Sequence, residues 1–325
     1  MLRGVEEQPL FECYRDFMRA NDASHKERTK DFYEELWDRI EPELGHLLVQ
    51  QIKTERLDDF LGSLPDHLSG SRKNKHMGFV RTLLRFSWRR GRLDSVPYVP
   101  LVRTTKTQKD WYSKKERDLL LDAIFRDSPE WYCFFYLSMR LGLRRGEVYG
   151  ITLDQLREDP PMLLVDRQIQ QGKKDRPAME NRRKSNEAYS MGLPLDVVDA
   201  IQWHIERGYS GDQYLFSKDG AFPKYLDSHR KPLKRAQEAT GLRQLSHHCL
   251  GRHSVASQAA SSGESLRVIQ AQLGQRSIQS TEVYAKVANH SQLRLVEGLA
   301  PDHPPHVNVV STESGQARES SRRHG

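Results

Sequence analysis

Apolar residues recur every three to four positions through most of the first hundred residues. That is the period of an α-helix that buries one face. Polar or proline-containing stretches interrupt the pattern only briefly. The pattern predicts a helical N-terminal region, with candidate helices at Leu10–Ala20, Lys30–Ile40, Arg56–Leu64 and Asn74–Arg90.

The composition changes between residues 96 and 109. This stretch contains two prolines, three threonines and several basic residues, with little periodicity. It is typical of a linker, so we expect a domain boundary there. Beyond it, Ser113 is followed three residues later by Glu116, the pattern of a capping box that opens a helix. The most hydrophobic stretch of the chain, Trp131–Leu141, should be a buried helix.

Two short β-like runs follow, at Met162–Val165 and Ala188–Met191, separated by a polar, base-rich connection. They predict a small antiparallel sheet. Helical patterns then return, at Leu195–Arg207, Tyr225–Thr240, Arg252–Ser261, Ser265–Leu273 and Ser280–Val287.

The expected fold is therefore mainly α, in two domains of ordinary size. A helical domain occupies residues 1–100 and a linker residues 101–110. A mixed, mostly helical domain with the small antiparallel sheet occupies residues 111–300. Residues 301–325 are rich in Pro, Ser, Gly and Arg and hold almost no large apolar residue, so we expect a disordered tail.

Composition excludes several classes of protein. Mean hydropathy is -0.75 and 29% of the residues are charged. No apolar run approaches the roughly 18 residues that cross a bilayer, and the first ten residues lack an apolar signal stretch. We therefore expect a cytoplasmic protein without a membrane partner. The three cysteines are widely scattered, which predicts neither a disulfide framework nor a metal site; they are Cys13, Cys133 and Cys249.

Positive charge is concentrated in one segment. The chain carries a net charge of +7, and its pI is about 9.2. Between Ser71 and Arg92 there is no acid, and four arginines are spaced to form one stripe on a helix: Arg81, Arg85, Arg89 and Arg92. Like charges at this spacing repel by a few tenths of a kcal/mol each, so phosphates of DNA are the better explanation. The same segment also holds Arg72, Lys73, Lys75 and Arg90.

Three separated segments carry the candidate chemistry. Gly142–Glu147 reads GLRRGE and directly follows the expected buried helix. His247–His253 reads HHCLGRH, and Leu273–Tyr284 reads LGQRSIQSTEVY. Together they place two arginines and a tyrosine, Arg144, Arg252 and Tyr284, in a fixed order along the chain.

At these segments the sequence resembles the tyrosine recombinase (phage integrase) family. That family has the motifs GLRxxE, HxLRH and LGHxSxxxTxxY, the last ending in the nucleophile. The resemblance covers about residues 110 to 290, and residues 1–100 are similar to the family's core-binding domain. It implies two domains that close around double-stranded DNA as a clamp, and strand exchange by a homotetramer on two DNA sites.

Elementary chemistry agrees with this resemblance. Cutting DNA reversibly without an energy source requires a nucleophile that stores the phosphodiester energy in a covalent bond, and a tyrosine phenol can do so. The transition state gathers charge on the nonbridging phosphate oxygens, which arginine is suited to hold. We therefore assign Arg144 and Arg252 to the phosphate and Tyr284 to the attack. No metal or nucleotide cofactor is required.

The remaining roles follow from the resemblance. The family's hairpin lysine, which protonates the departing 5′ oxygen, has three candidates between the two β-like runs, Lys173, Lys174 and Lys184. The distance from the second run favours Lys184. His248 corresponds to the residue that accepts or steers the tyrosine proton, and Glu147 to the acid that orients the site. Two other lysines of the same connection, Lys173 and Lys174, are expected to contact the DNA backbone.

The sequence departs from the family pattern at two positions. His248 lies four residues before Arg252 rather than three, as if Gly251 were an extra residue, and Cys249 takes the usual place of the histidine. Gln275 stands where the family usually has His or Trp; its amide can still bond a phosphate oxygen.

Alternatives to a site-specific recombinase remain open. One is a degenerate recombinase that binds DNA without cutting it, and another is a related tyrosine enzyme such as a topoisomerase or telomere resolvase. The sequence does not distinguish integration of a mobile element from resolution or inversion. Histidines outside the motifs are expected on the surface, among them His204 and His229.

Overall fold

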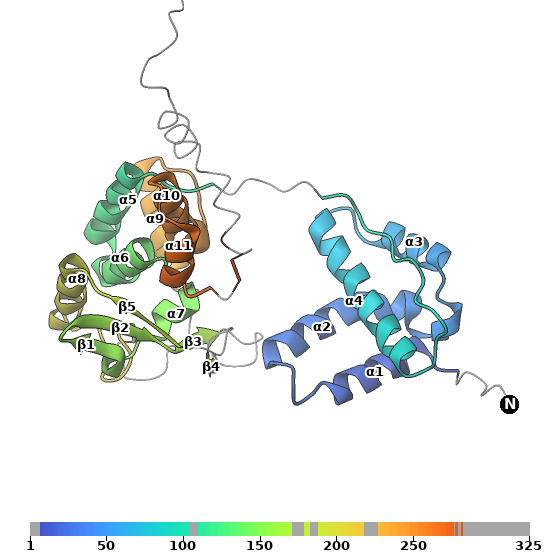
Figure 1. Ribbon diagram of the computed structural model, residues 1–325. Helices are drawn as coiled ribbons and strands as arrows, with labels where there is room; N and C mark the ends of the chain where they lie inside the picture. Colours follow the sequence, from blue (N-terminus) through green and yellow to red (C-terminus); the bar gives the residue numbers. More distant parts are fainter. Residues whose placement is uncertain are drawn as a thin grey trace, which may run out of the picture.

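The computed structural model describes residues 7–104, 110–170, 179–182, 188–217 and 227–275, together with 277, 278 and 281 (Figure 1). The buried apolar side chains of these residues form two large clusters, one before residue 100 and one after residue 111. The mainly helical fold with a small antiparallel sheet is confirmed.

Four α-helices build the first cluster. They are α1 (Leu10–Ala20), α2 (Glu27–Ile40), α3 (Thr54–Ser63) and α4 (Gly70–Arg89), with a short π-helix at Glu41–Gly45 and a 3-10 turn at Val49–Gln51. All four expected helices are present, but three begin two to four residues earlier than the apolar period indicated. In α4 the first turn holds only small and basic residues, and the Ser69 hydroxyl caps it by accepting from the Arg72 amide at 3.2 Å.

Aromatic side chains hold these helices together. Tyr14 of α1 stacks on Trp37 of α2, with ring centroids 4.3 Å apart. Tyr33 of α2 stacks on Phe79 of α4 at 4.4 Å. Such pairs contribute about 0.5–1.5 kcal/mol beyond the area they bury. They fix α4 against α1 and α2 along one side, which leaves its other side exposed.

The segment after α4 runs back along that helix. Val99 is 3% exposed, and its carbonyl accepts a hydrogen bond from Arg81 at 3.0 Å. Asn74 and the backbone of Val102 exchange two hydrogen bonds, of 2.9 and 2.8 Å. Residues up to 102 thus belong with the first cluster, although their composition resembles that of a linker.

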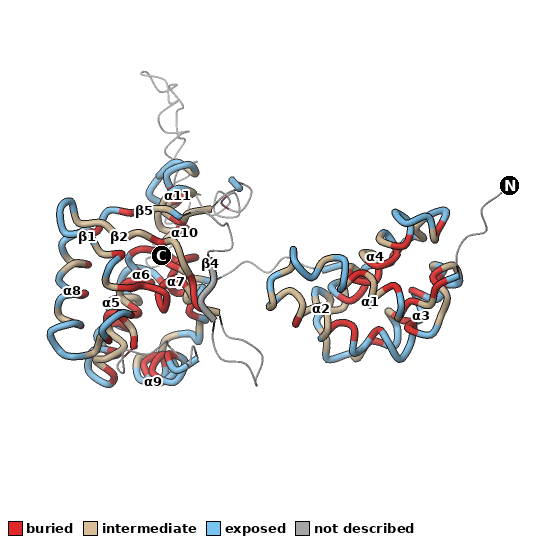
Figure 2. The backbone as a smooth tube through the Cα atoms, turned by 90° about the horizontal axis from the view of Figure 1, so that it is seen from below, coloured by how far each residue is buried: buried red, intermediate tan, exposed pale blue. Residues whose placement is uncertain are grey.

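The second cluster surrounds α6 (Tyr132–Leu141), which is drawn mostly as buried in Figure 2, within the left-hand lobe. The capping box expected at Ser113 and Glu116 is present and opens the helix before it. The elements around α6 are α5 (Lys114–Asp127), the 3-10 turn Pro129–Trp131, α7 (Arg145–Tyr149), the 3-10 turn Leu153–Gln155, α8 (Leu195–Glu206), α9 (Arg230–Thr240), the π-helix η5 (Cys249–His253), α10 (Ser254–Ser261) and α11 (Leu266–Gln272).

The expected strand pair forms the centre of an antiparallel sheet. β2 (Pro161–Val165) pairs with β5 (Tyr189–Gly192), with Leu163 opposite Met191, and β1 (Leu156–Glu158) extends the sheet beyond β2. The polar connection between β2 and β5 contains a second pair that the sequence did not indicate, β3 (Arg167–Gln170) with β4 (Met179–Arg182).

Three helical expectations need comment. The helix expected from Tyr225 begins at Arg230, after a turn at residues 227–229. The helix expected from Arg252 is preceded by η5 and by one turn of helix at 247–248, so the helical path begins at His247. The helix expected at Ser280–Val287 and the tail at 301–325 lie outside the described residues, apart from Thr281.

Two expectations about surface residues were wrong. His204 and His229 are 1% and 2% exposed, so both are core residues.

In the part of the chain that the structure describes, no helix combines the length and the apolar character needed to cross a membrane.

Candidate active site

Arg252 joins the three motif segments through hydrogen bonds to backbone carbonyls. Its side chain is 2% exposed, and it donates from Nη1 to the carbonyl of Gly142 at 3.3 Å and from Nη2 to that of Leu273 at 2.6 Å. Gly142 and Leu273 are the C-cap residues of α6 and α11. Because helix C-termini carry partial negative charge, they stabilise a buried guanidinium. Segments more than a hundred residues apart in sequence therefore meet at one cation.

Glycine at position 142 permits this meeting. Its backbone is left-handed, with φ at 71°, and an added Cβ would lie 2.8 Å from Cδ2 of Leu273 and 3.3 Å from Cγ1 of Val255. A second bond holds the same two helix ends together, from Nε2 of Gln272 to the carbonyl of Leu141 at 3.2 Å. Gln272 was not singled out by sequence, since an amide on a helix has no distinctive pattern.

Arg144 is fixed by a buried carboxylate. Glu147 is 1% exposed; its Oε1 accepts from Arg144 Nη1 at 2.7 Å and its Oε2 from the Arg144 backbone amide at 2.8 Å. The two bonds set both the start of α7 and the direction of the guanidinium, whose side chain is 33% exposed. Arg145, next to Arg144 in the chain, points elsewhere and pairs with Asp227 at 2.6 Å.

The extra residue before Arg252 is accommodated by the π-helix η5. A π-turn takes up one residue more than an α-turn, and such turns are frequent at functional sites. Gly251 lies within it, where an added Cβ would come 2.9 Å from the carbonyl of Ser138. His248 is exposed, with its ring centroid 4.4 Å from that of His253.

Gln275 accepts two hydrogen bonds from nearby side chains. Its Oε1 accepts from the Thr281 hydroxyl at 2.6 Å, and its backbone carbonyl accepts from Nε2 of Gln270 at 2.9 Å. Thr281 is fully buried. The Gln275 side chain is thus bonded to that of Thr281. Tyr284, Lys184, Lys173 and Lys174 lie outside the described residues.

The basic segment on α4 differs from its expected form in two respects. Acids from other elements do accompany it: Arg72 pairs with Glu35 of α2, and Lys73 lies 3.7 Å from Asp66. Moreover α4 ends at Arg89, so Arg92 leaves the stripe and pairs with Asp16 of α1 at 3.1 Å. A window of local sequence cannot show such partners, because they come from distant parts of the chain.

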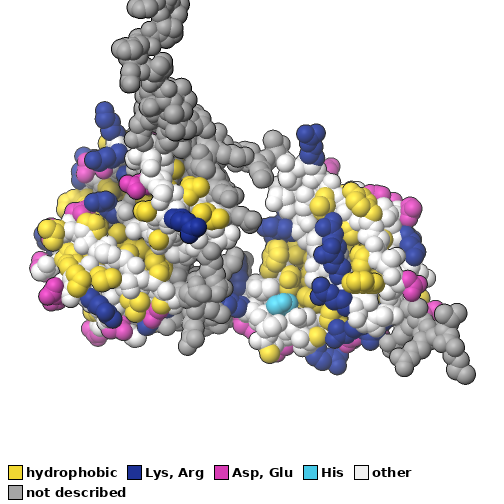
Figure 3. Space-filling view, viewed as in Figure 1, with side chains coloured by type: hydrophobic (Ala, Val, Ile, Leu, Met, Phe, Trp, Pro, Cys, Tyr) yellow, Lys and Arg dark blue, Asp and Glu magenta, His cyan; other side chains and the backbone are white. Residues whose placement is uncertain are grey.

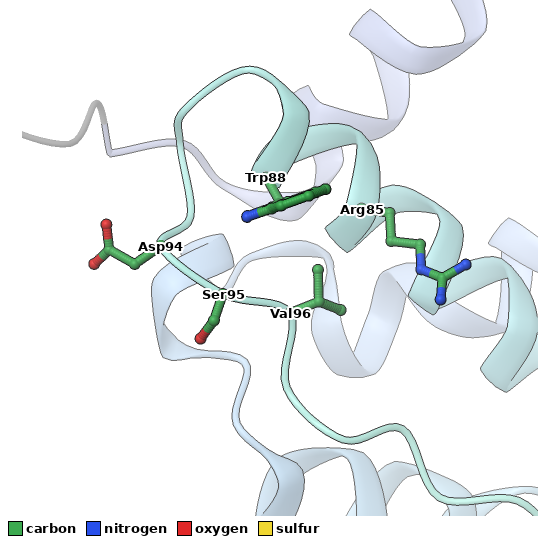
Figure 4. A pocket seen from close by; sticks show the side chains of 5 residues that line it. All are labelled: Arg85, Trp88, Asp94, Ser95 and Val96. Atoms are coloured by element: carbon green, nitrogen blue, oxygen red, sulfur yellow. The ribbon is translucent and has the colours of Figure 1, made fainter.

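A basic face nevertheless remains along α4. Figure 3 shows Lys and Arg side chains in a row over this helix, and Arg85 and Arg89 are exposed there. Trp88 lies between them in sequence and is 49% exposed. Figure 4 shows its ring above Ser95 and Val96, at a shallow depression of about 360 Å³ that Arg85 and Asp94 also line. An exposed tryptophan beside exposed arginines suits a surface that binds another molecule.

No metal site accompanies these groups. Among the described residues, no cluster of His, Cys, Asp and Glu side chains has the arrangement needed to hold a metal ion. Cys13 and Cys133 are buried thiols, and Cys249 is half-buried within η5.

Comparisons with known proteins agree with this geometry. The sequence profile of the phage integrase family matches residues 110–291. Tyrosine recombinase XerD of Bradyrhizobium diazoefficiens is 29% identical over 175 residues, which cover 52% of this chain and 52% of that protein. The chain thus spans about half the length of this curated relative.

Solved structures share the fold. The Tn1549 transposon integrase in complex with transposon right end DNA superposes with a TM-score of 0.78 at 17% identity, over 90% of this chain and all of that one. A lambda integrase tetramer bound to a Holliday junction gives a TM-score of 0.62 at 13% identity, over 85% and 78% of the two chains. Since the family profile spans more than half of the sequence, the chain belongs to the phage integrase family of tyrosine recombinases.

Proposed function

We propose that this protein is a site-specific recombinase that cuts and rejoins double-stranded DNA. The phenol oxygen of Tyr284 attacks a backbone phosphorus, the bond to the 5′ oxygen breaks, and a 3′-phosphotyrosine forms. A 5′ hydroxyl of the partner strand reverses the step on the other duplex, so the bond energy is conserved. The observation that carries the proposal is the bonding of Arg252 to the helix ends at Gly142 and Leu273, which brings the three motif segments together.

Each group has a role in this reaction. Arg144 and Arg252 hold the nonbridging phosphate oxygens, and loss of one such donor typically lowers the rate about 10²–10³-fold. Glu147 positions Arg144 through its two hydrogen bonds. The other roles are those that the family resemblance assigns: Lys184 protonates the 5′ oxygen, His248 accepts the phenol proton and Gln275 bonds the phosphate.

The remaining assignments concern the DNA and the assembly. Residues 1–100 form the core-binding domain, residues 111–300 the catalytic domain, and 101–110 the linker between them. The exposed charges on α4 support contact with DNA phosphates, which Arg85 and Arg89 are best placed to make. A homotetramer on two DNA sites follows from the family resemblance, and the cytoplasmic location remains the one expected from the sequence. Further contacts to the DNA backbone are assigned to Arg72, Lys73, Lys75, Arg81, Lys173 and Lys174, whereas Arg92 is left out because it pairs with Asp16.

A suicide substrate tests the chemistry. Duplex DNA carrying a nick beside the cleavage point releases a short fragment on attack and traps the covalent adduct. The wild-type protein is expected to form this adduct and Tyr284→Phe is expected to form none. Binding of the DNA without any adduct on the wild-type protein would instead support a module that binds DNA without cutting it.

A further inference from the structure

One residue of α6, Ser138, contacts both η5 and the helical turn directly before it. The hydroxyl of Ser138 lies 2.7 Å from Nε2 of His247, and both side chains are buried. The carbonyl of the same serine lies where a Cβ on Gly251 would approach to 2.9 Å. His247, two residues before η5, and Gly251, within η5, thus both lie against Ser138.

The direction of the hydrogen bond follows from counting hydrogens. Ser138 Oγ also donates to the carbonyl of Phe134 at 2.9 Å, and a hydroxyl has one hydrogen to donate. Both bonds are made only if His247 carries its hydrogen on Nε2 and donates to the serine. Burial, the neighbouring His229 and the Arg145 guanidinium hold the pKa of His247 well below its usual value. The ring is therefore a neutral donor at physiological pH.

Ser138 is linked to Arg252 both through η5 and through the end of α6. On η5, Gly251 directly precedes Arg252. On α6, the Ser138 carbonyl accepts from the Gly142 amide at 3.1 Å, and the Gly142 carbonyl accepts from Arg252. A shift of η5 relative to Ser138 would therefore move the guanidinium away from its carbonyl acceptor.

A π-turn also needs support from outside itself. It is rare in proteins, because an α-turn makes better hydrogen bonds with the same backbone. Here a buried side-chain bond at its start and a close backbone approach at Gly251 favour the wider turn. The hydroxyl of Ser254 adds a third support by donating to the carbonyl of Cys249 at 2.9 Å.

We propose that Ser138 and His247 are positioning residues, whose hydrogen bond holds η5 in the register that directs Arg252 and His248 to the scissile phosphate. The proposal rests on the recombinase activity proposed above. Neither residue touches the DNA. They affect the rate of DNA cleavage because they fix the position of Arg252.

The test separates the chemical step from DNA binding. Ser138→Ala and His247→Leu are compared with the wild-type protein on the nicked duplex at saturating protein. The rate of adduct formation is expected to fall about 10- to 100-fold in both, because a displacement of about 1 Å has effects of that size. The dissociation constant for the DNA should stay within about twofold, because DNA is bound mainly through phosphate contacts elsewhere.

A rescue variant and a matched control distinguish positioning from loss of stability. In His247→Gln the side-chain amide can still donate to Ser138, so most of the rate should return. Tyr136→Phe removes another hydrogen bond of α6, the 2.6 Å bond to Asp196 of α8, and should keep the wild-type rate. A wild-type rate in Ser138→Ala, or an equal loss in Tyr136→Phe, would overturn the proposal.

Amide hydrogen exchange keeps this proposal distinct from the recombinase activity. Ser138→Ala should speed exchange in residues 249–254 without DNA, whereas Tyr136→Phe should not. If the wild-type protein formed no adduct, the recombinase proposal would fall, and the exchange of residues 249–254 would decide the positioning proposal alone. Unchanged exchange in Ser138→Ala would then refute it.

Discussion

Replacing Gly142 by alanine probes the junction at which Arg252 is held. The backbone there has φ at 71°, which costs a residue with a side chain about 1–2 kcal/mol. The new methyl group would also lie 2.8 Å from Leu273 and 3.3 Å from Val255. Leu273 is fully buried, so its side chain cannot swing into solvent. Overpacking of this kind typically costs a further 1–3 kcal/mol or so. We therefore expect a total loss of about 2–5 kcal/mol.

Gly208 provides the matched control for this substitution. Its φ is 67°, close to that of Gly142, but nothing lies within 4 Å of an added Cβ. Gly208→Ala should therefore cost only the backbone part, about 1–2 kcal/mol. Urea unfolding of the two variants, followed by circular dichroism, gives the difference between them. Equal losses in the two variants would refute the claim that α6 and α11 meet too closely for a side chain at 142.

Three further predictions follow from the described contacts. Glu147→Gln should lower the free energy of unfolding by about 1.5–3 kcal/mol, since a charge-assisted bond to Arg144 is lost; an unchanged urea midpoint would contradict this. Replacing Arg85 and Arg89 by alanine should reduce the slope of the logarithm of the DNA-binding constant against the logarithm of the salt concentration by about two, as measured by fluorescence anisotropy. A slope equal to that of the wild-type protein would exclude both residues from the DNA interface. Burial lowers the pKa of His247 in the folded protein, so below pH 6.5 the unfolded state takes up a proton at this residue more readily than the folded state does. The stability that depends on neutral His247 is therefore fully present above that pH. As the pH is lowered from 7 to 5, the free energy of unfolding should fall by up to about 1.4 kcal/mol per pH unit. The fall should be less steep in His247→Gln, and denaturation midpoints measured over this pH range test both expectations.

The elements that sequence predicted best are those whose signal is local. Leu10–Ala20 begins and ends as expected, because its apolar period and its boundaries fall together. The capping box at Ser113 and the β2–β5 pair also depend on adjacent residues alone. β3 and β4 escaped notice because their residues are mostly polar and do not alternate.

The sequence could not predict ion pairs between residues that lie far apart in the chain. The basic segment seemed free of acids, yet Glu35 and Asp16 approach it from α2 and α1. Nothing near Arg72 or Arg92 in the chain indicates these partners. The charges that a face presents to DNA are therefore set by packing as well as by composition.

In the candidate site, the reactive side chains could be predicted from the sequence, but the groups that hold them in place could not. Arg144 and Arg252 could be named because their chemistry depends on the type of side chain. The acceptors that hold Arg252 are backbone carbonyls, which every residue has, so no sequence pattern identifies them. The close packing of the segments around Arg252 is visible in the sequence as glycines: an added Cβ would lie 2.8 Å from Cδ2 of Leu273 at Gly142 and 2.9 Å from the Ser138 carbonyl at Gly251. In this site the two glycines mark places where neighbouring segments leave no room for a side chain. Their substitution should therefore disturb Arg252 without removing any group that reacts.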